Sequence, residues 1–383
     1  MRVGIDASNT HSGGTLTHIV EFLRAANPSA HGFTQIVVWG GRKTLACIED
    51  RSWLIKCHQP MLDMSLPYRV IWQCSRLSNL ARKAGCDVLF VPGGSYSGSF
   101  RPVVAMSQNV LLFEWQEIWR YGLRWPILKN VLLRLVQTRT FRRVDGLIFL
   151  TQYAQRVVMK VVKRHPGPVS IIPHGIHERF FYTPRICLRT DAFTNEKPVL
   201  LLYVSRIEPY KHQGHVVEAV GLLRKAGLSV AIDLVGPSYN KSEMVRLNRI
   251  LQCIDPEARF VRYRGTVPYE VLHEFYRKAD IKIFASSCEN MPNILLESMA
   301  AGLPIACSNR GPMPEVLGDA GLYFDPEQPN DIARAIRTLI KSPDLRLEKA
   351  QAAHERARQF SWTRCADETL EFLSRVCAGS ATQ

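Results

Sequence analysis

Long apolar runs are missing from this sequence. No stretch of 18 residues, about the length that an apolar helix needs to cross a bilayer, is free of Asp, Glu, Lys and Arg. Residues 2–6 already have the pattern of a short strand, and no apolar signal-peptide core precedes them. We therefore expect a cytoplasmic protein. An apolar share of 46% is enough for complete cores in two or three domains.

Cysteine pairs with metal-binding or redox spacing are also missing. The ten cysteines include no Cys-x-x-Cys pair and no zinc-type spacing; they are Cys47, Cys57, Cys74, Cys86, Cys187, Cys253, Cys288, Cys307, Cys365 and Cys377. Reduced thiols in ordinary cores are therefore expected. We predict no metal site and no bound cofactor.

Acidic residues are scarce relative to basic ones. The chain has 34 Asp and Glu against 49 Lys and Arg, which gives a net charge of +15. Residues 101–165 hold twelve basic and three acidic residues, so +9 of this charge lies there. Such a surplus is typical of proteins that meet nucleic acid, an anionic membrane or an anionic substrate. No groove-reading motif is present, so nucleic-acid binding is kept only as a less favoured alternative.

The G-x-G-x-x-G fingerprint of dinucleotide-binding domains is absent as well. In its place, the strand pattern at 2–7 is followed by Gly13 and Gly14 and then by a helical pattern over 16–23. A glycine-rich turn before a helix can present backbone N–H groups to a phosphate. An ordinary tight turn explains the pair equally well.

What the chain does contain is a repeated alternation of strands and helices. Strand patterns at 36–39, 88–91, 103–107 and 146–150 alternate with helical stretches, and a second series begins at Val199. The pattern predicts an α/β protein with doubly wound sheets. We expect a first domain over 1–178, a linker over 179–198, a second domain over 199–360, and a C-terminal helix and tail over 361–383.

Two amides and one long segment stand out in the first domain. Gln108 and Asn109 follow a strand and are candidates for hydrogen bonds to a substrate, although satisfied loop amides explain them equally well. Residues 113–143 interleave aromatic and basic side chains and predict a basic amphipathic helix with an aromatic lead-in. Such a helix fits docking on an anionic membrane, where each basic residue contributes about 1 kcal/mol. Core aromatics with solvated arginines are the equally good alternative.

The most informative residues lie in the second domain. Seven residues separate Glu289 from Glu297; the pair follows a strand pattern at 281–285, and Pro292 and Asn293 are helix-start signals. Glu289 is therefore expected in a strand-to-helix loop and Glu297 about one turn inside the helix, at the sheet edge where open α/β proteins bind ligands. Arg206 and Lys211 follow the strand pattern at 199–204, where their charges favour a phosphate group.

Together these motifs resemble the retaining nucleotide-sugar glycosyltransferases of family 4, which have the GT-B fold. The resemblance covers nearly the whole chain. It rests on the E-x7-E signature from Glu289 to Glu297, Ser205-Arg206 with Lys211, Gly13-Gly14, Pro173-His174-Gly175-Ile176 and Phe360-Ser361-Trp362. It implies two Rossmann-like domains that face each other across a cleft, with a C-terminal helix that crosses back to the first.

The implied activity is transfer of a sugar from a nucleotide-diphosphate sugar to a saccharide or lipid-linked saccharide acceptor. Surface polysaccharide or lipopolysaccharide assembly at the inner face of the membrane is the implied setting. Arg206 and Lys211 would bind the diphosphate and, with Glu289, take part in catalysis, whereas Glu297 would hydrogen-bond the ribose. Further implied donor contacts are Gly13 and Gly14 at the phosphates, Tyr263 to Val267 near the base, and Glu289, Asn290, Met291, Pro292, Asn293 and Ile294 at the sugar.

The sequence departs from the family pattern at three places. Gln108-Asn109 stands where many members have a His, Glu289-Asn-Met-Pro replaces the usual Glu-Gly-Phe-Gly, and His174 stands where Asn is frequent. The donor sugar therefore stays open. An epimerase or a phosphorylase on the same fold is the main alternative. Hydrolysis by two carboxylates, as in glycosidases, would leave Arg206 and Lys211 without a role.

Overall fold

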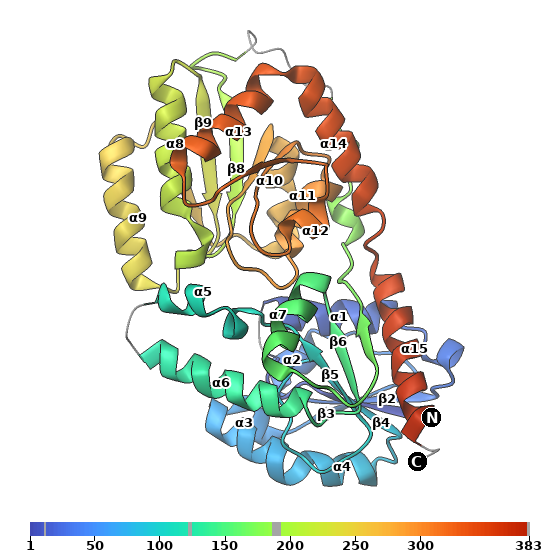
Figure 1. The fold of residues 1–383 in the computed structure, drawn as a ribbon. Coiled ribbons are helices and arrows are strands. Elements are labelled where there is room, and N and C mark those ends of the chain that lie inside the picture. Colours follow the sequence, from blue (N-terminus) through green and yellow to red (C-terminus); the bar gives the residue numbers. More distant parts are fainter. Residues whose placement is uncertain (11–12, 122–124, 186–192, 381–383) are drawn as a thin grey trace. The chain divides into compact units, whose positions relative to one another are not determined.

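The chain folds into two compact units. The computed structural model describes residues 1–10, 13–121, 125–185 and 193–380 (Figure 1). The first unit contains Met1–Ile118, Gly122–Gly175 and Phe360–Gln383, and the second contains Trp119–Tyr121 and Ile176–Gln359. Part of the predicted linker, 186–192, and the end of the predicted tail, 381–383, lie outside the described residues.

The first unit is built on a parallel sheet of seven strands. Their order is β3-β2-β1-β4-β5-β6-β7, so it reverses between β1 and β4. The strands are β1 (Arg2–Asp6), β2 (Gln35–Gly40), β3 (Leu54–His58), β4 (Val88–Val91), β5 (Val103–Ser107), β6 (Gly146–Phe149) and β7 (Val169–Ile171). The central strands β4, β5 and β6 are buried along their whole length, as expected for a sheet covered on both faces.

Helices of the first unit follow the predicted alternation. They are α1 (Gly14–Ala25), α2 (Arg42–Ala46), α3 (Leu66–Trp72), α4 (Ser78–Lys83), α5 (Trp115–Trp119), α6 (Trp125–Phe141), α7 (Gln152–Val162) and α15 (Trp362–Ser380). The last residue of α5 already belongs to the second unit. The aromatic lead-in of the 113–143 segment is itself partly helical, as α5, and residues 122–124 between α5 and α6 lie outside the described residues. The predicted helix therefore corresponds to α6.

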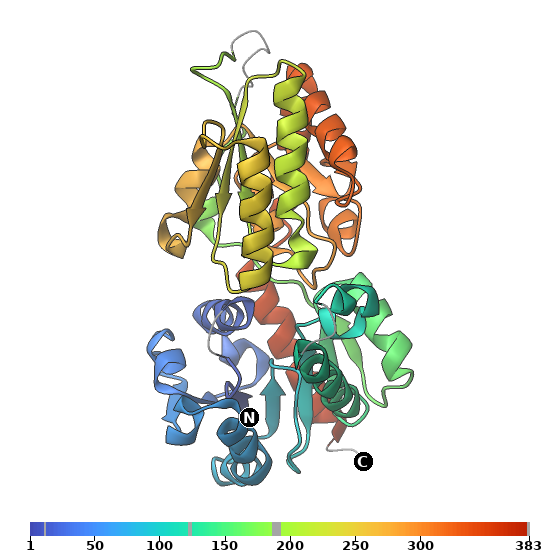
Figure 2. The ribbon, with the colours of Figure 1, turned by 90° about the vertical axis from the view of Figure 1, so that its left-hand side faces the viewer.

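The second unit repeats the design with six parallel strands. They are β8 (Val199–Val204), β9 (Val230–Val235), β10 (Val261–Gly265), β11 (Ile281–Phe284), β12 (Ile305–Ser308) and β13 (Leu322–Phe324), in the order β10-β9-β8-β11-β12-β13. Its helices are α8 (Gln213–Lys225), α9 (Lys241–Ile254), α10 (Leu272–Lys278), α11 (Asn293–Ala300), α12 (Met313–Leu317), α13 (Pro329–Lys341) and α14 (Pro343–Ala357). Figure 2 shows α8 and α9 side by side on one face of this sheet. The order reverses between β8 and β11.

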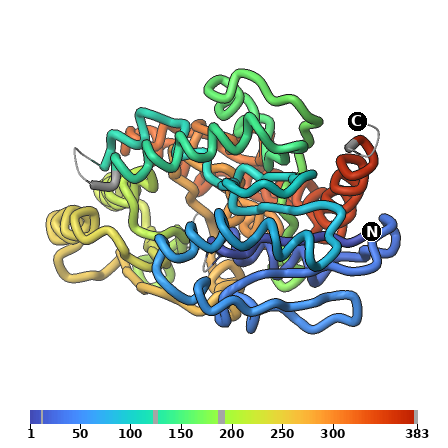
Figure 3. Tube along the Cα trace, turned by 90° about the horizontal axis from the view of Figure 1, so that it is seen from below, coloured from blue at the N-terminus to red at the C-terminus, as the bar shows by residue number. Residues whose placement is uncertain are grey.

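The C-terminal helix α15 belongs to the first unit, as the sequence predicts. It packs along α1 and β4, and Figure 3 shows it (red) beside the N-terminal segments (blue). Its inward side chains include Leu370, Phe372 and Leu373, all buried. The helix therefore forms part of the hydrophobic core of the first unit, although Ile176–Gln359, which precede it in the sequence, belong to the second unit.

Gly175 allows the start of α15 to pack closely. A Cβ atom at this position would collide with the backbone of Ser361 and Trp362. Next to it, the His174 ring stacks on Trp362 and on His18, with centroid distances of 5.5 and 4.8 Å. The Pro173-His174-Gly175-Ile176 motif thus has a packing role.

The Gly175→Ala variant should therefore be destabilised. A methyl group at 175 must push the backbone of Trp362 away, and we expect a loss of about 2 kcal/mol or more in the free energy of unfolding. Urea unfolding followed by tryptophan fluorescence measures it. Gly379→Ala in α15 is the matched control, because a Cβ there meets nothing within 4 Å. Equal stability of the two variants would contradict this packing role.

No helix within the described residues is long and apolar enough to span a membrane.

Candidate active site

The predicted cations and Glu289 meet where the strand order of the second sheet reverses. Arg206 and Lys211 lie in the loop after β8, and Glu289 lies in the loop after β11. Because β8 and β11 are parallel neighbours, both loops emerge at the carboxyl edge of the sheet. This topological switch point is where open α/β sheets bind ligands.

Lys211 and Glu289 form an ion pair across this point. The Lys211 Nζ donates to Glu289 Oε1, and the two side chains are only 11% and 17% exposed. The Ser287 N–H also donates to the Tyr210 carbonyl at 2.9 Å, and the Tyr203 hydroxyl donates to the Lys211 carbonyl. Backbone and side-chain bonds together fix the position of the ammonium group.

Arg206 lies beside this pair. Its carbonyl accepts a 2.7 Å hydrogen bond from Gln213 Nε2 at the start of α8, which holds the loop against the helix. Desolvation opposes the charge of the Arg206 guanidinium, but nearby acidic and tyrosine side chains, Tyr210 and Glu289 first among them, together raise its pKa. The site therefore holds two cations within the electrostatic reach of one carboxylate.

Glu297 lies in a different environment from Glu289. It is the fifth residue of α11 and only 4% exposed. The Tyr269 hydroxyl donates to its Oε1 and the Tyr276 hydroxyl to its Oε2, both at 2.9 Å. Burial raises the pKa of Glu297 to about 7, although the two tyrosines oppose this shift. Each carboxylate oxygen keeps a lone pair for a further donor.

Two more basic residues lie near Glu297 and its tyrosine partners. Lys282 of β11 is fully buried; its Nζ lies 5.3 Å from the centroid of the Tyr276 ring, and burial lowers its pKa well below the usual value. Arg179 lies 4.3 Å over the Tyr269 ring. Both charges help to keep the pKa of Glu297 from rising further. The sequence alone did not identify Tyr269, Tyr276, Lys282 or Arg179 as neighbours of Glu297. Only the unusual place of Lys282, a lysine inside the apolar strand 281–284, indicated one of them.

The remaining second-unit residues of the prediction lie along the same edge. Asn290, Met291 and Pro292 are buried in the loop before α11, Asn293 begins that helix, and Ile294 is half-buried. Tyr263 of β10 donates its hydroxyl to the Gly236 carbonyl at 2.9 Å, and Val267 is half-buried.

Four predicted residues lie in the first unit. Gly13 has a φ of 69°, which suits glycine, and precedes α1, which begins at Gly14. Asn109 Oδ1 accepts a 3.2 Å bond from the Leu111 N–H, and Gln108 Nε2 lies 3.2 Å from the Met106 sulfur. The Asn109 contact is the one expected of an ordinary loop amide.

A polar cluster that the sequence did not reveal lies at the switch point of the first sheet. Asp6, at the end of β1, accepts hydrogen bonds from Gln73 Nε2 at 2.5 Å and from the Ser8 N–H at 2.9 Å. Gln73 begins a π-helical turn and also donates to the Ser95 carbonyl at 2.8 Å. Burial raises the pKa of Asp6. Such π-turns are frequent at functional sites.

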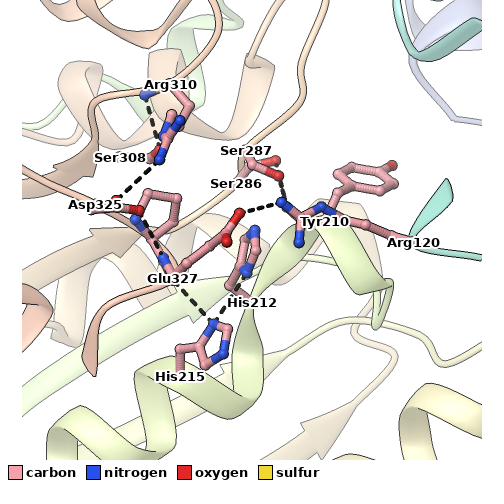
Figure 4. Close-up of polar contacts among 11 residues, drawn as sticks. Arg120, Tyr210, His212, His215, Ser286, Ser287, Ser308, Arg310, Asp325 and Glu327 are labelled. Atoms are coloured by element: carbon pink, nitrogen blue, oxygen red, sulfur yellow. Dashed lines mark hydrogen bonds and ion pairs between the residues drawn. The ribbon is translucent and has the colours of Figure 1, made fainter. Parts of the chain in front are cut away.

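Residues 119–121 add charges to the second unit. Figure 4 shows Arg120 reaching Glu327, with which it forms an ion pair, and the Tyr121 hydroxyl donates to Glu208 at 3.1 Å. Burial and the Arg120 charge lower the pKa of His212 to about 3, so this imidazole is neutral at pH 7. Arg120 is therefore a third cation near the Lys211 loop, supplied by a distant part of the chain.

The nine cysteines within the described residues are free, and Cys187 lies outside them. In the same residues, no group of three or more His, Cys, Asp or Glu is placed to hold a metal ion.

A family profile and a curated relative each match part of this chain. The family profile described as Glycosyl transferases group 1 matches residues 188–360. O-antigen chain mannosyltransferase B of Escherichia coli is 31% identical over 169 residues, which cover 44% of this chain and 44% of that protein. The chain spans about half the length of the curated relatives it matches.

Solved structures resemble the chain over its whole length. Sucrose-phosphate synthase from Thermosynechococcus elongatus has a TM-score of 0.77 at 17% identity, covering 99% of this chain and 100% of that one. HepE from Anabaena, in complex with UDP-glucose, has a TM-score of 0.70 at 16% identity and covers 100% of both chains. The chain therefore has the GT-B fold, and residues 188–360 are a domain of the glycosyl transferases group 1 family.

Proposed function

We propose that this chain is a retaining glycosyltransferase that moves a sugar from a nucleotide-diphosphate sugar to a saccharide or lipid-linked saccharide acceptor during surface polysaccharide assembly. The observation that carries the proposal is the Lys211–Glu289 ion pair, with Arg206 beside it, at the switch point of the second sheet. The names of two relatives support it, since one is an O-antigen mannosyltransferase and HepE was solved with UDP-glucose.

The two cations suit a nucleoside diphosphate as leaving group. Negative charge grows on the departing phosphate as the glycosidic bond breaks, and fixed positive groups stabilise that state more than the ground state. Glu289 orients Lys211 before the donor arrives, so little reorganisation is needed. Arg206 and Lys211 supply the positive charge that a metal ion supplies in other transferases, and we propose that transfer is metal-independent.

The two glutamates would grip different parts of the donor. Glu297, held by Tyr269 and Tyr276, would accept hydrogen bonds from the ribose hydroxyls through its remaining lone pairs. Glu289 and the loop of Asn290 to Asn293 would face the sugar. The acceptor oxygen would attack the anomeric carbon on the face that the phosphate leaves, and its proton would pass to the departing phosphate oxygen.

A thermal-shift panel followed by product analysis tests the proposal. UDP-glucose, GDP-mannose, ADP-glucose and the free diphosphates are compared, because a specific ligand stabilises the folded state. The donor that shifts the melting temperature is then supplied with saccharide acceptors, and proton NMR reads the product. Retention of the donor's anomeric configuration is expected. Release of an epimer or of free sugar phosphate would replace transfer with epimerisation or phosphorolysis.

Removing either cation should slow turnover strongly. We expect Arg206→Ala and Lys211→Ala each to lower kcat/KM on the order of 100-fold or more, because each removes charge stabilisation from the leaving group. Release of nucleoside diphosphate measures the rate. Arg337→Ala, at an exposed position on α13, is the control and should match wild type. A loss below about threefold in both site variants would contradict the assigned roles.

Donor affinity should rise with pH through about 7. The folded-state pKa of Glu297 is about 7, so the carboxyl is mostly protonated at pH 6 and mostly ionised at pH 8. Only the ionised form offers two full acceptors, and we expect Kd to fall by up to about tenfold over this range. Calorimetry with a nucleotide sugar measures it, since this diphosphate diester does not itself titrate there.

Two variants test whether Glu297 causes that pH step. Glu297→Gln should bind weakly and independently of pH. Tyr269→Phe removes a hydrogen-bond donor that favours the ionised carboxylate of Glu297. In this variant the rise in donor affinity should therefore occur at higher pH. A wild-type affinity that does not change between pH 6 and 8 would show that the Glu297 proton is not linked to donor binding.

Transfer should persist without divalent metal. Treatment with EDTA followed by desalting is expected to leave the turnover rate within about twofold of the untreated enzyme, since Arg206 and Lys211 provide the fixed charge. Loss of activity that Mg²⁺ or Mn²⁺ restores would overturn metal independence without affecting the proposed donor.

A further inference from the structure

The outward face of α6 carries a stripe of leucines, whereas an ordinary surface helix is polar there. Among the side chains described on α6, the exposed ones are Leu128, Lys129, Leu132, Leu135 and Arg139. The three leucines are 59%, 62% and 63% exposed. Steps of four and three residues place them in one stripe. Figures 1 and 2 show α6 (teal) on the outside of the first unit.

Three uncharged polar residues near the end of α6 face the interior. Gln137, Thr138 and Thr140 are buried, and Thr140 exchanges hydrogen bonds with the Tyr96 backbone. Three leucines of α6 therefore meet solvent, whereas these amide and hydroxyl groups meet the protein. Three exposed leucines in one line form a contiguous apolar patch, and larger patches of this kind mark interaction sites.

An arginine-lined cavity adjoins the end of this stripe. Its volume is about 520 Å³, and its lining includes Arg101, Arg139, Arg143, Ser97 and Ser99. Arg139 continues the line of leucines by one helical turn. Arg101 is held by Asp145 at 3.3 Å and donates to the Arg143 carbonyl. Among the described residues, neither Arg139 nor Arg143 has an acidic partner.

This cavity does not lie at the carboxyl edge of the first sheet, where its strand order reverses. Its lining includes Val103, the first residue of β5, and Val144, which precedes β6. Parallel strands carry ligand sites at their carboxyl ends, whereas this cavity lies at the amino ends. A ligand bound here would therefore not be a substrate at the switch point.

Several basic residues of the 113–143 segment already have contacts within the protein. Arg120 pairs with Glu327, Arg134 stacks 4.4 Å over the Trp115 ring, and Arg142 donates to the Val162 carbonyl at 3.0 Å. Arg124 lies outside the described residues. Lys129, Arg139 and Arg143 are left to face outward beside the leucines.

We propose that this leucine face and the adjoining arginine cavity dock the chain on an anionic lipid bilayer. The leucines would enter the acyl boundary while a lipid phosphate occupies the arginine cavity, which is the arrangement of an interfacial amphipathic helix. A second copy of the chain fits poorly, because pairing through this face would bring like charges together. The inference goes beyond the proposed sugar transfer and does not depend on it.

Flotation of the full chain with vesicles tests the proposal. Vesicles of equal parts phosphatidylglycerol and phosphatidylcholine are compared with phosphatidylcholine alone, at low and high salt. Wild type should bind the anionic vesicles and lose most binding in high salt. Leu132→Ser with Leu135→Ser, and Arg139→Ala with Arg143→Ala, should each weaken the partition coefficient about tenfold or more.

Matched controls keep the result specific. Val245→Ser on α9 removes an equally exposed apolar group, 58% exposed, and Arg337→Ala removes an exposed charge on α13; both should bind as wild type does. Thermal unfolding confirms that every variant is folded. No binding of wild type to anionic vesicles would overturn the proposal, and so would equal losses in the controls.

Two further outcomes would assign the surface to another occupant. If inorganic phosphate raises the melting temperature through Arg139 and Arg143 but vesicles do not bind, the cavity is a free-anion site. If sedimentation shows a dimer that Leu132→Ser with Leu135→Ser abolishes, and vesicles do not bind, the face pairs two copies. Either result overturns lipid docking while leaving the transferase proposal untouched.

Discussion

The ion pair between Lys211 and Glu289 ties the second unit together at its switch point. The loops after β8 and β11 reach the same edge because the strands are parallel neighbours, and this contact joins the first loop to the second. A backbone bond from Ser287 to Tyr210 reinforces it. A cation held in this way is fixed before any ligand binds, and such preorganisation would make charge stabilisation effective in the proposed catalysis.

Two glutamates only eight positions apart acquire different properties from their surroundings. Glu289 is half-buried and paired with a lysine, whereas Glu297 is buried between two tyrosine hydroxyls, with a pKa raised to about 7. The helix start at Asn293 separates them, since it turns the chain between the two positions. The surroundings of the two glutamates, rather than their residue type, thus explain their different proposed roles: Glu289 would contact the sugar and Glu297 the ribose.

Much of the fold was predictable from the sequence, because local residue patterns determine where many strands and helices begin and end. The strands at 88–91 and 103–107 and the helix start at Asn293 are found where their apolar runs and start signals place them. The edge strand β3 was missed, since its residues are half-exposed and include Lys56. Tyr269 and Tyr276 were not found because their contact with Glu297 spans more than twenty residues, and Tyr276 has the spacing of an ordinary core residue. Arg120 pairs with Glu327, which is 207 residues later in the sequence, and no local pattern encodes such a contact.

A double-mutant cycle on Lys211 and Glu289 tests the central claim most directly. The kcat/KM of Lys211→Met, Glu289→Gln and the double variant is compared with wild type, with donor and acceptor fixed. If Glu289 acts largely by holding Lys211, the double variant should be little worse than Lys211→Met alone, with a coupling energy of about 1 kcal/mol or more. Additive losses, with coupling near zero, would contradict the claim that this contact organises the site.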